Sequence, residues 1–228
     1  DEEMVAAMSE QLSSRTRLAL IDHVSSATAL VLPIAQLIER CRERGVVSLI
    51  DGAHGPGMLD LDLSQLDPDI YIGNLHKWCC APKGAAFIYA KPSAHSWLKP
   101  AITSHGYRPE GRIATLAEQF DWPGTFDPTP WFCIPTALET LASLYPGGFA
   151  ELRSEMIALR RQAEELLGAV LQPLRSANDS PAWMRSFVLP PGEGPQPLAL
   201  EMDPLQRRLV RDHRIQVPVS AWPAWPQR

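Results

Sequence analysis

A strand–helix–strand pattern with short connections is the feature that most constrains the fold of this chain. Residues 17–21 (RLALI) and 46–50 (VVSLI) are apolar runs that are typical of buried strands. Between them, Pro33 suits the first position of a helix and Gly45 suits its C-terminal cap. One apolar stripe at helical spacing is formed by Ile34, Leu37, Ile38 and Cys41. Because such units cross over in the right-handed sense, we expect the two strands to be parallel members of one sheet.

Two more strands are predicted at residues 70–72 and 84–90, and they are close enough in the sequence to pair antiparallel. The predicted fold class is α/β, with a mainly parallel sheet flanked by helices. From residue 129 the pattern changes to helices at 137–145, 149–171 and 204–212 and to short strands at 186–189, 198–202 and 215–219. We therefore expect residues 1–130 to be part of a large α/β domain. Residues 131–228 should hold bridging helices and a smaller α+β C-terminal domain.

Charge and composition exclude several classes of function. The 228 residues include 21 Lys and Arg against 26 Asp and Glu, and this net charge of -5 argues against non-specific nucleic-acid binding. No apolar run approaches the roughly 18 residues of a membrane span. The four cysteines show no CxxC spacing, so we expect neither a disulfide framework nor a zinc site, and a cytoplasmic location is the default.

Polar clusters follow the predicted strands at residues 22–26 (DHVSS), 51–54 (DGAH) and 74–78 (NLHKW). In open α/β sheets, ligands bind beyond the carboxyl ends of the strands. We therefore expect the three clusters to meet at one edge of the sheet and to form a site there.

Asp51 and Lys77 each have a structural and a functional interpretation. Asp51 could cap a turn, as many Asp-Gly pairs do, or it could keep the nitrogen of a pyridine ring protonated. Lys77 could be a solvated surface lysine, but its neighbours from residue 75 to residue 82 are mostly apolar or bulky. Such surroundings disfavour the charged amine, so Lys77 could be the nucleophile of a Schiff base.

Four motifs lie in a characteristic order: HVSSAT at 23–28, DGAHGPG at 51–57, HKWCCAPKG at 76–84 and DWPGT at 121–125. This order resembles the class V aminotransferase family of pyridoxal 5'-phosphate enzymes, and most closely its isopenicillin-N-epimerase-like branch, which also includes sulfur-amino-acid lyases. The resemblance implies the fold-type-I architecture of pyridoxal-phosphate-dependent transferases. It also implies an enzyme that acts on an amino acid as an epimerase, a lyase or an aminotransferase.

The resemblance implies a role for each site residue. Lys77 would form the internal aldimine with the cofactor and later shuttle the α-proton, and Asp51 would pair with the pyridine nitrogen. His54 would lie near the phenolic oxygen of the cofactor, and Thr125 would reach the cofactor phosphate of the neighbouring subunit. The other cofactor-binding residues would be His76 and Asn74 beside the phosphate, His23 near the ring, and Ser26 in the same loop as His23.

The sequence departs from its relatives at several positions. Ser26, Ala29 and Asn74 stand where cysteine desulfurases often have Asn, Gly and Ser, and Phe126 stands where epimerase-like enzymes often have Arg. The phosphate-binding turn and stacking aromatic residue of the family's N-terminal portion, and its C-terminal substrate-binding arginine, have no counterpart here. We therefore expect a fragment that lacks both parts and is inactive alone. The resemblance also implies a homodimer with shared active sites.

Two other interpretations stay open. A metal-dependent hydrolase could use Asp51, His54 and His76, although no HExxH or comparable spacing supports a metal site. A non-catalytic remnant could keep the fold and have lost the cofactor site. His54 and His76 could then be structural histidines, and Thr125 could be a turn residue.

Overall fold

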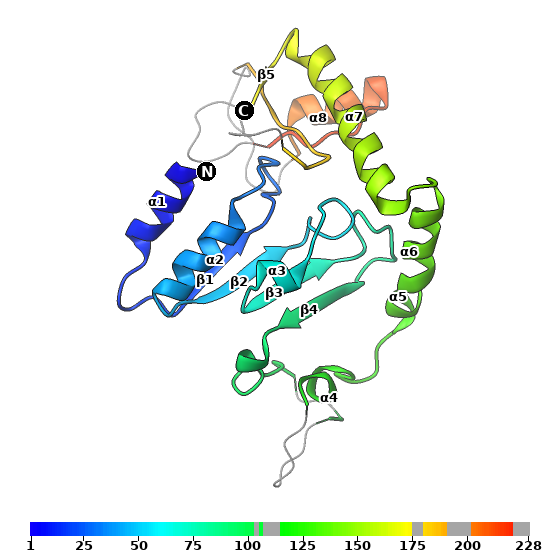
Figure 1. Ribbon diagram of the computed structural model, residues 1–228. Coiled ribbons are helices and arrows are strands. Elements are labelled where there is room, and N and C mark those ends of the chain that lie inside the picture. The colour runs from blue at the N-terminus through cyan, green and yellow to red at the C-terminus, as the bar shows by residue number, and fades with distance from the viewer. Residues whose placement is uncertain (103–104, 107–114, 175–179, 191–201, 221–228) are drawn as a thin grey trace.

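A four-stranded sheet organises the computed structural model, which describes residues 1–102, 105–106, 115–174, 180–190 and 202–220 (Figure 1). The strands lie side by side in chain order as β1 (Leu18–Asp22), β2 (Val47–Gly52), β3 (Ile70–Asn74) and β4 (Ala86–Ala90). β1, β2 and β3 are parallel, whereas β4 pairs antiparallel with β3. The predicted parallel sheet and the antiparallel last pair are therefore confirmed.

Helix α2 (Ile34–Glu43) covers one face of this sheet. Its buried residues are those of the predicted stripe, Ile34, Leu37, Ile38 and Cys41. They pack in one core cluster with Ile21, Ile50 and Tyr71 from the three parallel strands. α3 (Leu63–Leu66) and α1 (Glu2–Gln11), which the sequence did not predict, add partly buried residues to this cluster and lie on the same side of the sheet (Figure 1).

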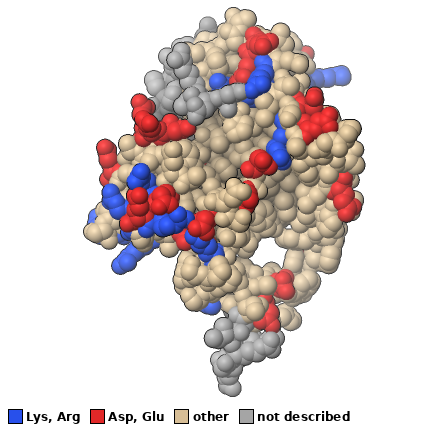
Figure 2. All heavy atoms as spheres, viewed as in Figure 1, with Lys and Arg blue, Asp and Glu red and all other residues tan. Residues whose placement is uncertain are grey.

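The outer surface of α2 is charged with both signs (Figure 2). Arg40 pairs with Glu43 at 2.7 Å, and Arg42 reaches Asp67 at 2.9 Å. These exposed pairs contribute little to stability, but they keep this side of the helix in water. Helix α2 is therefore amphipathic, and its apolar side is fixed against the sheet.

The opposite face of the sheet is open in the described part of the chain. Strand side chains alternate between the two faces, and the exposed apolar ones are Leu18, Leu20, Ile72 and Ile88. The strand register places Asp22 beside Asp51, and Asp51 beside Ile72. Both carboxylates therefore lie on this open face.

The chain continues after β4 through η1 (Pro92–Ala94), α4 (Leu116–Phe120) and α5 (Thr129–Phe132). Two longer helices, α6 (Ile134–Ser143) and α7 (Gly148–Gly168), then run along one side of the sheet (Figure 1). Arg153 of α7 forms an ion pair with Asp60 of the loop after β2, at 2.8 Å.

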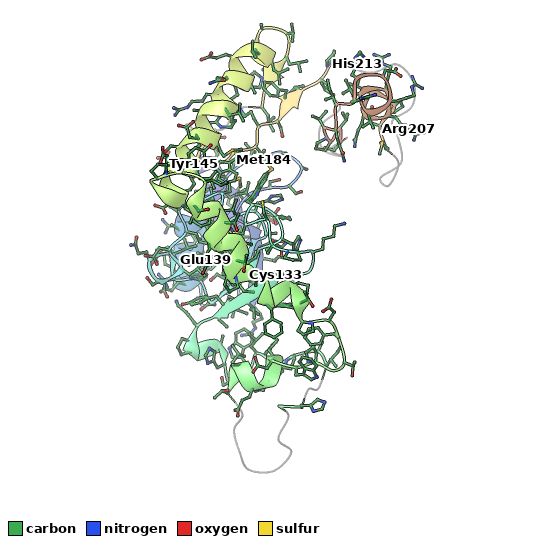
Figure 3. All side chains as sticks on the ribbon, turned by 90° about the vertical axis from the view of Figure 1, so that its right-hand side faces the viewer. Cys133, Glu139, Tyr145, Met184, Arg207 and His213 are labelled. Carbon is green, nitrogen blue, oxygen red and sulfur yellow. The ribbon has the colours of Figure 1, made fainter. Side chains whose placement is uncertain are left out.

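Short elements complete the described chain. β5 (Gln172–Pro173) and β6 (Phe187–Val188) pair antiparallel, and α8 (Pro204–Arg208) and η2 (Leu209–His213) follow. Figure 3 shows Arg207 and His213 of these last helices away from the sheet. Within the described residues, no helix combines the length and the apolar character that a membrane crossing requires.

The second half of the chain follows the sequence predictions in part. The helix predicted at 149–171 is α7, and the one predicted at 137–145 is α6, which begins earlier because its first turn accepts Pro135. The strand predicted at 186–189 is reduced to β6, and the helix predicted at 204–212 is split into α8 and η2.

The strand predicted at 215–219 is wrong. This segment forms no ladder with the described residues: Pro218 has no N–H to donate, and the N–H of Val219 donates to the Gln206 side chain at 2.9 Å. Of the strand predicted at 198–202, only Met202 lies within the described residues.

Tyr71 packs directly beneath the loop that follows β2. A Cβ atom added to Gly52 would lie 1.9 Å from Cζ of Tyr71, and one added to Gly55 would lie 2.1 Å from its hydroxyl oxygen. Tyr71 is fully buried, so its ring has no free space to move into. The glycines of the DGAHG motif therefore allow the ring to fill the space under the loop that carries Asp51 and His54.

We expect Gly52→Ala to destabilise the fold, because the added methyl group overlaps the Tyr71 ring. Overpacking of this kind lowers the free energy of unfolding by about 1–3 kcal/mol. Gly168→Ala at the end of α7 is the control, since its Cβ meets no described atom within 4 Å, and it should be neutral or slightly stabilising. Urea unfolding of the two variants measures the difference, and equal stabilities would contradict the close approach.

Candidate active site

The carboxyl ends of β1, β2 and β3 meet at one edge of the sheet because the three strands are parallel. The three predicted polar clusters lie at these strand ends. The backbone N–H of His23 donates to the carbonyl oxygen of Asp51 at 2.8 Å, which joins the first cluster to the second. The side chains of His54 and Lys77 are in contact, which joins the second cluster to the third. The expected meeting of the clusters is therefore observed.

His54 links Lys77 to Trp78 in a short hydrogen-bond chain. The indole Nε1–H of Trp78 donates to Nδ1 of His54 at 3.2 Å. On the other side of the ring, Nζ of Lys77 lies 3.1 Å from Nε2 of His54. All three side chains are partly buried. These hydrogen-bond contacts therefore hold the Lys77 amine at the edge of the sheet.

The charge state of His54 follows from its surroundings. Burial lowers the pKa of His54, and the charge of Lys77 lowers it further. Asp51 and Asp22 act in the opposite direction, but the net pKa shift is downward. The imidazole is therefore neutral near pH 7.

Asp51 combines the two interpretations that the sequence left open. Its Oδ1 accepts the backbone N–H of Ala53 at 2.9 Å, which is a turn-capping hydrogen bond. Its Oδ2 accepts no hydrogen bond from the described residues, and the residue is exposed. One carboxylate oxygen is thus available to a cationic group at this edge.

His23 lies in the interior rather than at the open edge. Only 9% of its surface is exposed, and its Nδ1 lies 2.9 Å from the hydroxyl oxygen of Tyr71. Burial lowers the pKa of His23 to about 4. Burial and the charge of Asp51 raise the pKa of Tyr71. The two side chains are therefore an uncharged, hydrogen-bonded pair beneath the Asp51 loop.

His76 and Asn74 lie at the end of β3, and both are partly buried. Nδ1 of His76 lies 3.0 Å from the carbonyl oxygen of Ala85, so Nδ1 carries the proton that it donates. Its Nε2 makes no hydrogen bond to the described residues. Asn74 is the last residue of β3 and pairs with Ala86 in the ladder.

Ser26 and Thr125 are exposed, and the side-chain contact of Lys77 among the described residues is with His54 rather than with either of them. Ser26 lies in the turn before Ala29, which has a φ of 56°, the left-handed conformation that suits the glycine of related sequences. Thr125 lies in the loop between α4 and α5 and makes no hydrogen bond to the described residues. The role of Thr125 toward a neighbouring subunit therefore stays a prediction.

The residues of the metal-hydrolase alternative do not form a ligand group. Within the described part of the chain, no cluster of three or more His, Cys, Asp and Glu side chains is arranged to hold a metal ion. His54 uses both ring nitrogens in contacts with Trp78 and Lys77, and His76 uses Nδ1 on a carbonyl oxygen. The geometry therefore gives this alternative no support.

A segment from the second half of the chain packs against the site. The ring of Trp183 meets the ring of Trp78 edge-on, with centroids 5.6 Å apart. Ala182 is fully buried in a cluster with Val24 and Met58 from the loops after β1 and β2. The loops that carry the site are thus backed by residues that are far away in the sequence.

Two residues of the site were not predicted as functional. In the sequence, Trp78 stands out only as a bulky neighbour of Lys77, and Tyr71 only as part of a strand. The role of Trp78 could have been inferred from its chemistry. A tryptophan in a polar loop carries one N–H donor, and this donor needs a hydrogen-bond acceptor when the ring is buried. For Tyr71, the signal is Gly52 and Gly55 in the motif at 51–57, because such glycines indicate a close approach by another group.

A family model described as "Aminotransferase class-V" matches residues 2–186 of the chain. Isopenicillin N epimerase from Amycolatopsis lactamdurans is 35% identical over 237 residues, which cover 99% of this chain and 57% of the relative. A probable chloroplastic L-cysteine desulfhydrase from Arabidopsis thaliana is 38% identical over 138 residues, covering 59% of this chain and 28% of the relative. The chain thus spans little more than half the length of the epimerase that it matches.

Solved structures show the same fold. The cysteine desulfurase CsdA from Escherichia coli has a TM-score of 0.67 at 21% identity, and covers 90% of this chain and 49% of its own. A complex between the cystine C-S lyase C-DES and its reaction product cysteine persulfide has a TM-score of 0.71 at 24% identity, over 93% of this chain and 56% of its own. The predicted fold-type-I architecture is therefore confirmed.

The buried His23 predicts a pH-dependent stability. Its folded-state pKa of about 4 lies below the ordinary value of 6.5, so the unfolded chain takes up a proton at a higher pH than the folded chain does. The stabilisation is complete above the ordinary pKa of 6.5 and is lost progressively as the pH falls from that value to the folded-state pKa of about 4. Between about pH 7 and pH 5, this residue should lower the free energy of unfolding by roughly 2 kcal/mol.

Urea unfolding at both pH values measures this loss in the wild type and in His23→Gln, which keeps a polar partner for Tyr71 but does not titrate. His23→Gln should reduce the pH dependence, whereas His213→Gln on the exposed η2 should leave it unchanged. An unaltered pH dependence in His23→Gln would show that the buried histidine is not its source.

Proposed function

We propose that this chain, which belongs to the aminotransferase class-V family, carries the central part of the cofactor site of a pyridoxal-phosphate-dependent enzyme that acts on an amino acid. The observation that carries the proposal is the position of the Lys77 amine. It is partly buried at the carboxyl edge of the parallel sheet, 3.1 Å from Nε2 of His54. An amine held in place and partly shielded from water is what covalent attachment to an aldehyde requires.

The residues present fit pyridoxal phosphate. Lys77 offers an amine for the aldehyde. Asp51, at the end of the neighbouring strand β2 on the same edge, offers a carboxylate oxygen without a hydrogen-bond partner among the described residues. Bound there, pyridoxal phosphate would supply an electron sink that stabilises negative charge on the α-carbon of an amino acid.

Each residue of the site would have its own role in holding the cofactor or in moving the α-proton. Lys77 would hold the cofactor and carry the α-proton on Nζ. Asp51 would keep the ring nitrogen protonated, and His54 would lie beside the phenolic oxygen. His76 and Asn74 would lie beside the phosphate, and Nδ1 of His76 is already held by the carbonyl oxygen of Ala85. Ser26 would lie in the loop beside the ring, and the buried His23, paired with Tyr71, would lie beneath that part of the site.

Epimerisation, elimination and transamination all begin with a broken bond at the α-carbon. The likeness to isopenicillin N epimerase extends over 99% of this chain, whereas the likeness to the cysteine desulfhydrase extends over 59%. This favours amino-acid epimerisation as the first activity to assay, with sulfur-amino-acid elimination second.

Three further features belong to the proposal. The whole protein acts as a homodimer in which the exposed Thr125 serves the cofactor phosphate of the partner subunit. A reducing compartment such as the cytoplasm suits the four cysteines, which are all free thiols. The chain divides near residue 130 into the large cofactor-binding domain and the bridging helices with the small domain.

Replacement of Lys77 tests the proposal directly. In the full-length protein, addition of pyridoxal phosphate followed by borohydride should label the peptide that contains Lys77. Lys77→Ala should abolish this label, whereas Lys83→Ala, an exposed lysine on the same loop, should keep it. Label that persists on another lysine would contradict the assignment. A complete lack of cofactor binding in the wild type would favour the non-catalytic remnant.

Asp51→Asn should separate cofactor binding from turnover. The amide can still accept the Ala53 N–H, so the loop should fold as before. It no longer favours a protonated ring nitrogen, so exchange of the substrate α-proton with solvent should slow by roughly a hundredfold or more, at about tenfold for each 1.36 kcal/mol. Asp60→Asn, an exposed carboxylate paired with Arg153, is the control. If Asp51→Asn exchanged the substrate α-proton at the wild-type rate, Asp51 would be only a turn residue.

A further inference from the structure

Trp78 fixes which nitrogen of His54 carries a proton. The indole Nε1–H can only donate, and it points at Nδ1 of His54 from 3.2 Å. Nδ1 must therefore present its lone pair. Because a neutral imidazole has one N–H, the proton of His54 lies on Nε2.

The Nε2–H group of His54 faces the amine of Lys77. The two nitrogens are 3.1 Å apart, which is hydrogen-bond distance. A hydrogen bond between them needs a lone pair on Nζ, and only the uncharged amine has one. If Lys77 were an ammonium group, its N–H groups would face the Nε2–H group of His54 and no hydrogen bond could form. The ammonium form would be favoured only if His54 moved its proton to Nδ1 and lost the hydrogen bond from Trp78.

Other groups around His54 work against this arrangement. Asp51 on β2 and Asp22 on β1 favour a protonated imidazole, whereas burial opposes it, and a charged Lys77 would oppose it further. A protonated His54 would carry a hydrogen on Nδ1 and collide with the indole N–H of Trp78. The indole therefore opposes the protonation of His54 that the two carboxylates favour, and it keeps His54 in one neutral tautomer.

We propose that Trp78 is a positioning residue that holds His54 in its Nε2–H tautomer and thereby favours the free-amine form of Lys77. The importance of the free amine rests on the proposed function, since only this form attacks the aldehyde of a cofactor. Trp78 itself is held in place by the edge of Trp183 and by the cluster around Met58. The indole thus acts on Lys77 through His54 and does not touch the reacting atoms.

Trp183 provides a matched control. It is also a tryptophan of this aromatic pair, but its buried Nε1–H has no hydrogen-bond partner among the described residues. Trp78→Phe and Trp183→Phe each keep a ring and remove one indole N–H. Only the first substitution removes a donor to His54.

Competitive acetylation of the full-length, cofactor-free protein measures the free amine. Limiting acetic anhydride is applied across a pH series, and mass spectrometry compares the Lys77 peptide with the exposed Lys83 after cleavage between them. In Trp78→Phe, acetylation of Lys77 at neutral pH should fall about three- to tenfold, the effect of one neutral hydrogen bond. Its pH profile should shift upward, whereas Trp183→Phe should match the wild type. His54→Ala should remove the effect of a second substitution at Trp78.

Nitrogen-15 NMR of the His54 ring gives an independent readout that loss of packing would not mimic. The wild type should show a protonated Nε2 and an unprotonated Nδ1, and Trp78→Phe should show a mixture of tautomers. A wild-type ring protonated on Nδ1 would overturn the proposal even if no variant folds. Unchanged Lys77 acetylation in Trp78→Phe would do the same. Neither result depends on cofactor binding, so the proposed function stands or fails separately on the borohydride label.

Discussion

The parallel register of β1, β2 and β3 is the constraint on which the rest of the structure depends. It brings three loops, separated in the sequence by whole helices or long connections, to one edge of the sheet. Two of those loops then supply a carboxylate, an imidazole and an amine within one small region. Without this register the same residues would be unrelated surface side chains, because no two of the three loops are adjacent in the sequence.

The space beneath the loop after β2 is filled by a single aromatic side chain. Tyr71 occupies the volume that side chains at positions 52 and 55 would need, and its hydroxyl binds the buried His23. The DGAHG loop is thus supported by an aromatic ring rather than by its own side chains. The backbone that carries Asp51 and His54 therefore has little room to shift.

The sheet and helix α2 could be predicted because their signals are local: apolar runs, one helical stripe and suitable end residues. The clustering of the polar loops could also be predicted, since it follows from parallel strands. The contact between His54 and Trp78 could not, because it joins residues 24 positions apart and depends on the course of two loops. The pairing of His23 with Tyr71, 48 positions apart, was hidden for the same reason. The segment at 215–219 has the apolar pattern of a strand, yet no described neighbour pairs with it, and a strand cannot be judged without its partner.

Packing of another layer on the open face of the sheet and binding of a cation near this face affect each other. Asp22 and Asp51 lie side by side on this face, next to the exposed side chains of Leu20 and Ile72. Any layer that packs on the apolar residues would also withdraw water from two adjacent negative charges, which is unfavourable unless a positive group compensates them. Covering the face and binding a cation beside the carboxylates are therefore thermodynamically coupled, and each strengthens the other by the same factor. A protonated ring nitrogen at this edge would thus act on the assembly of the protein as well as on its chemistry.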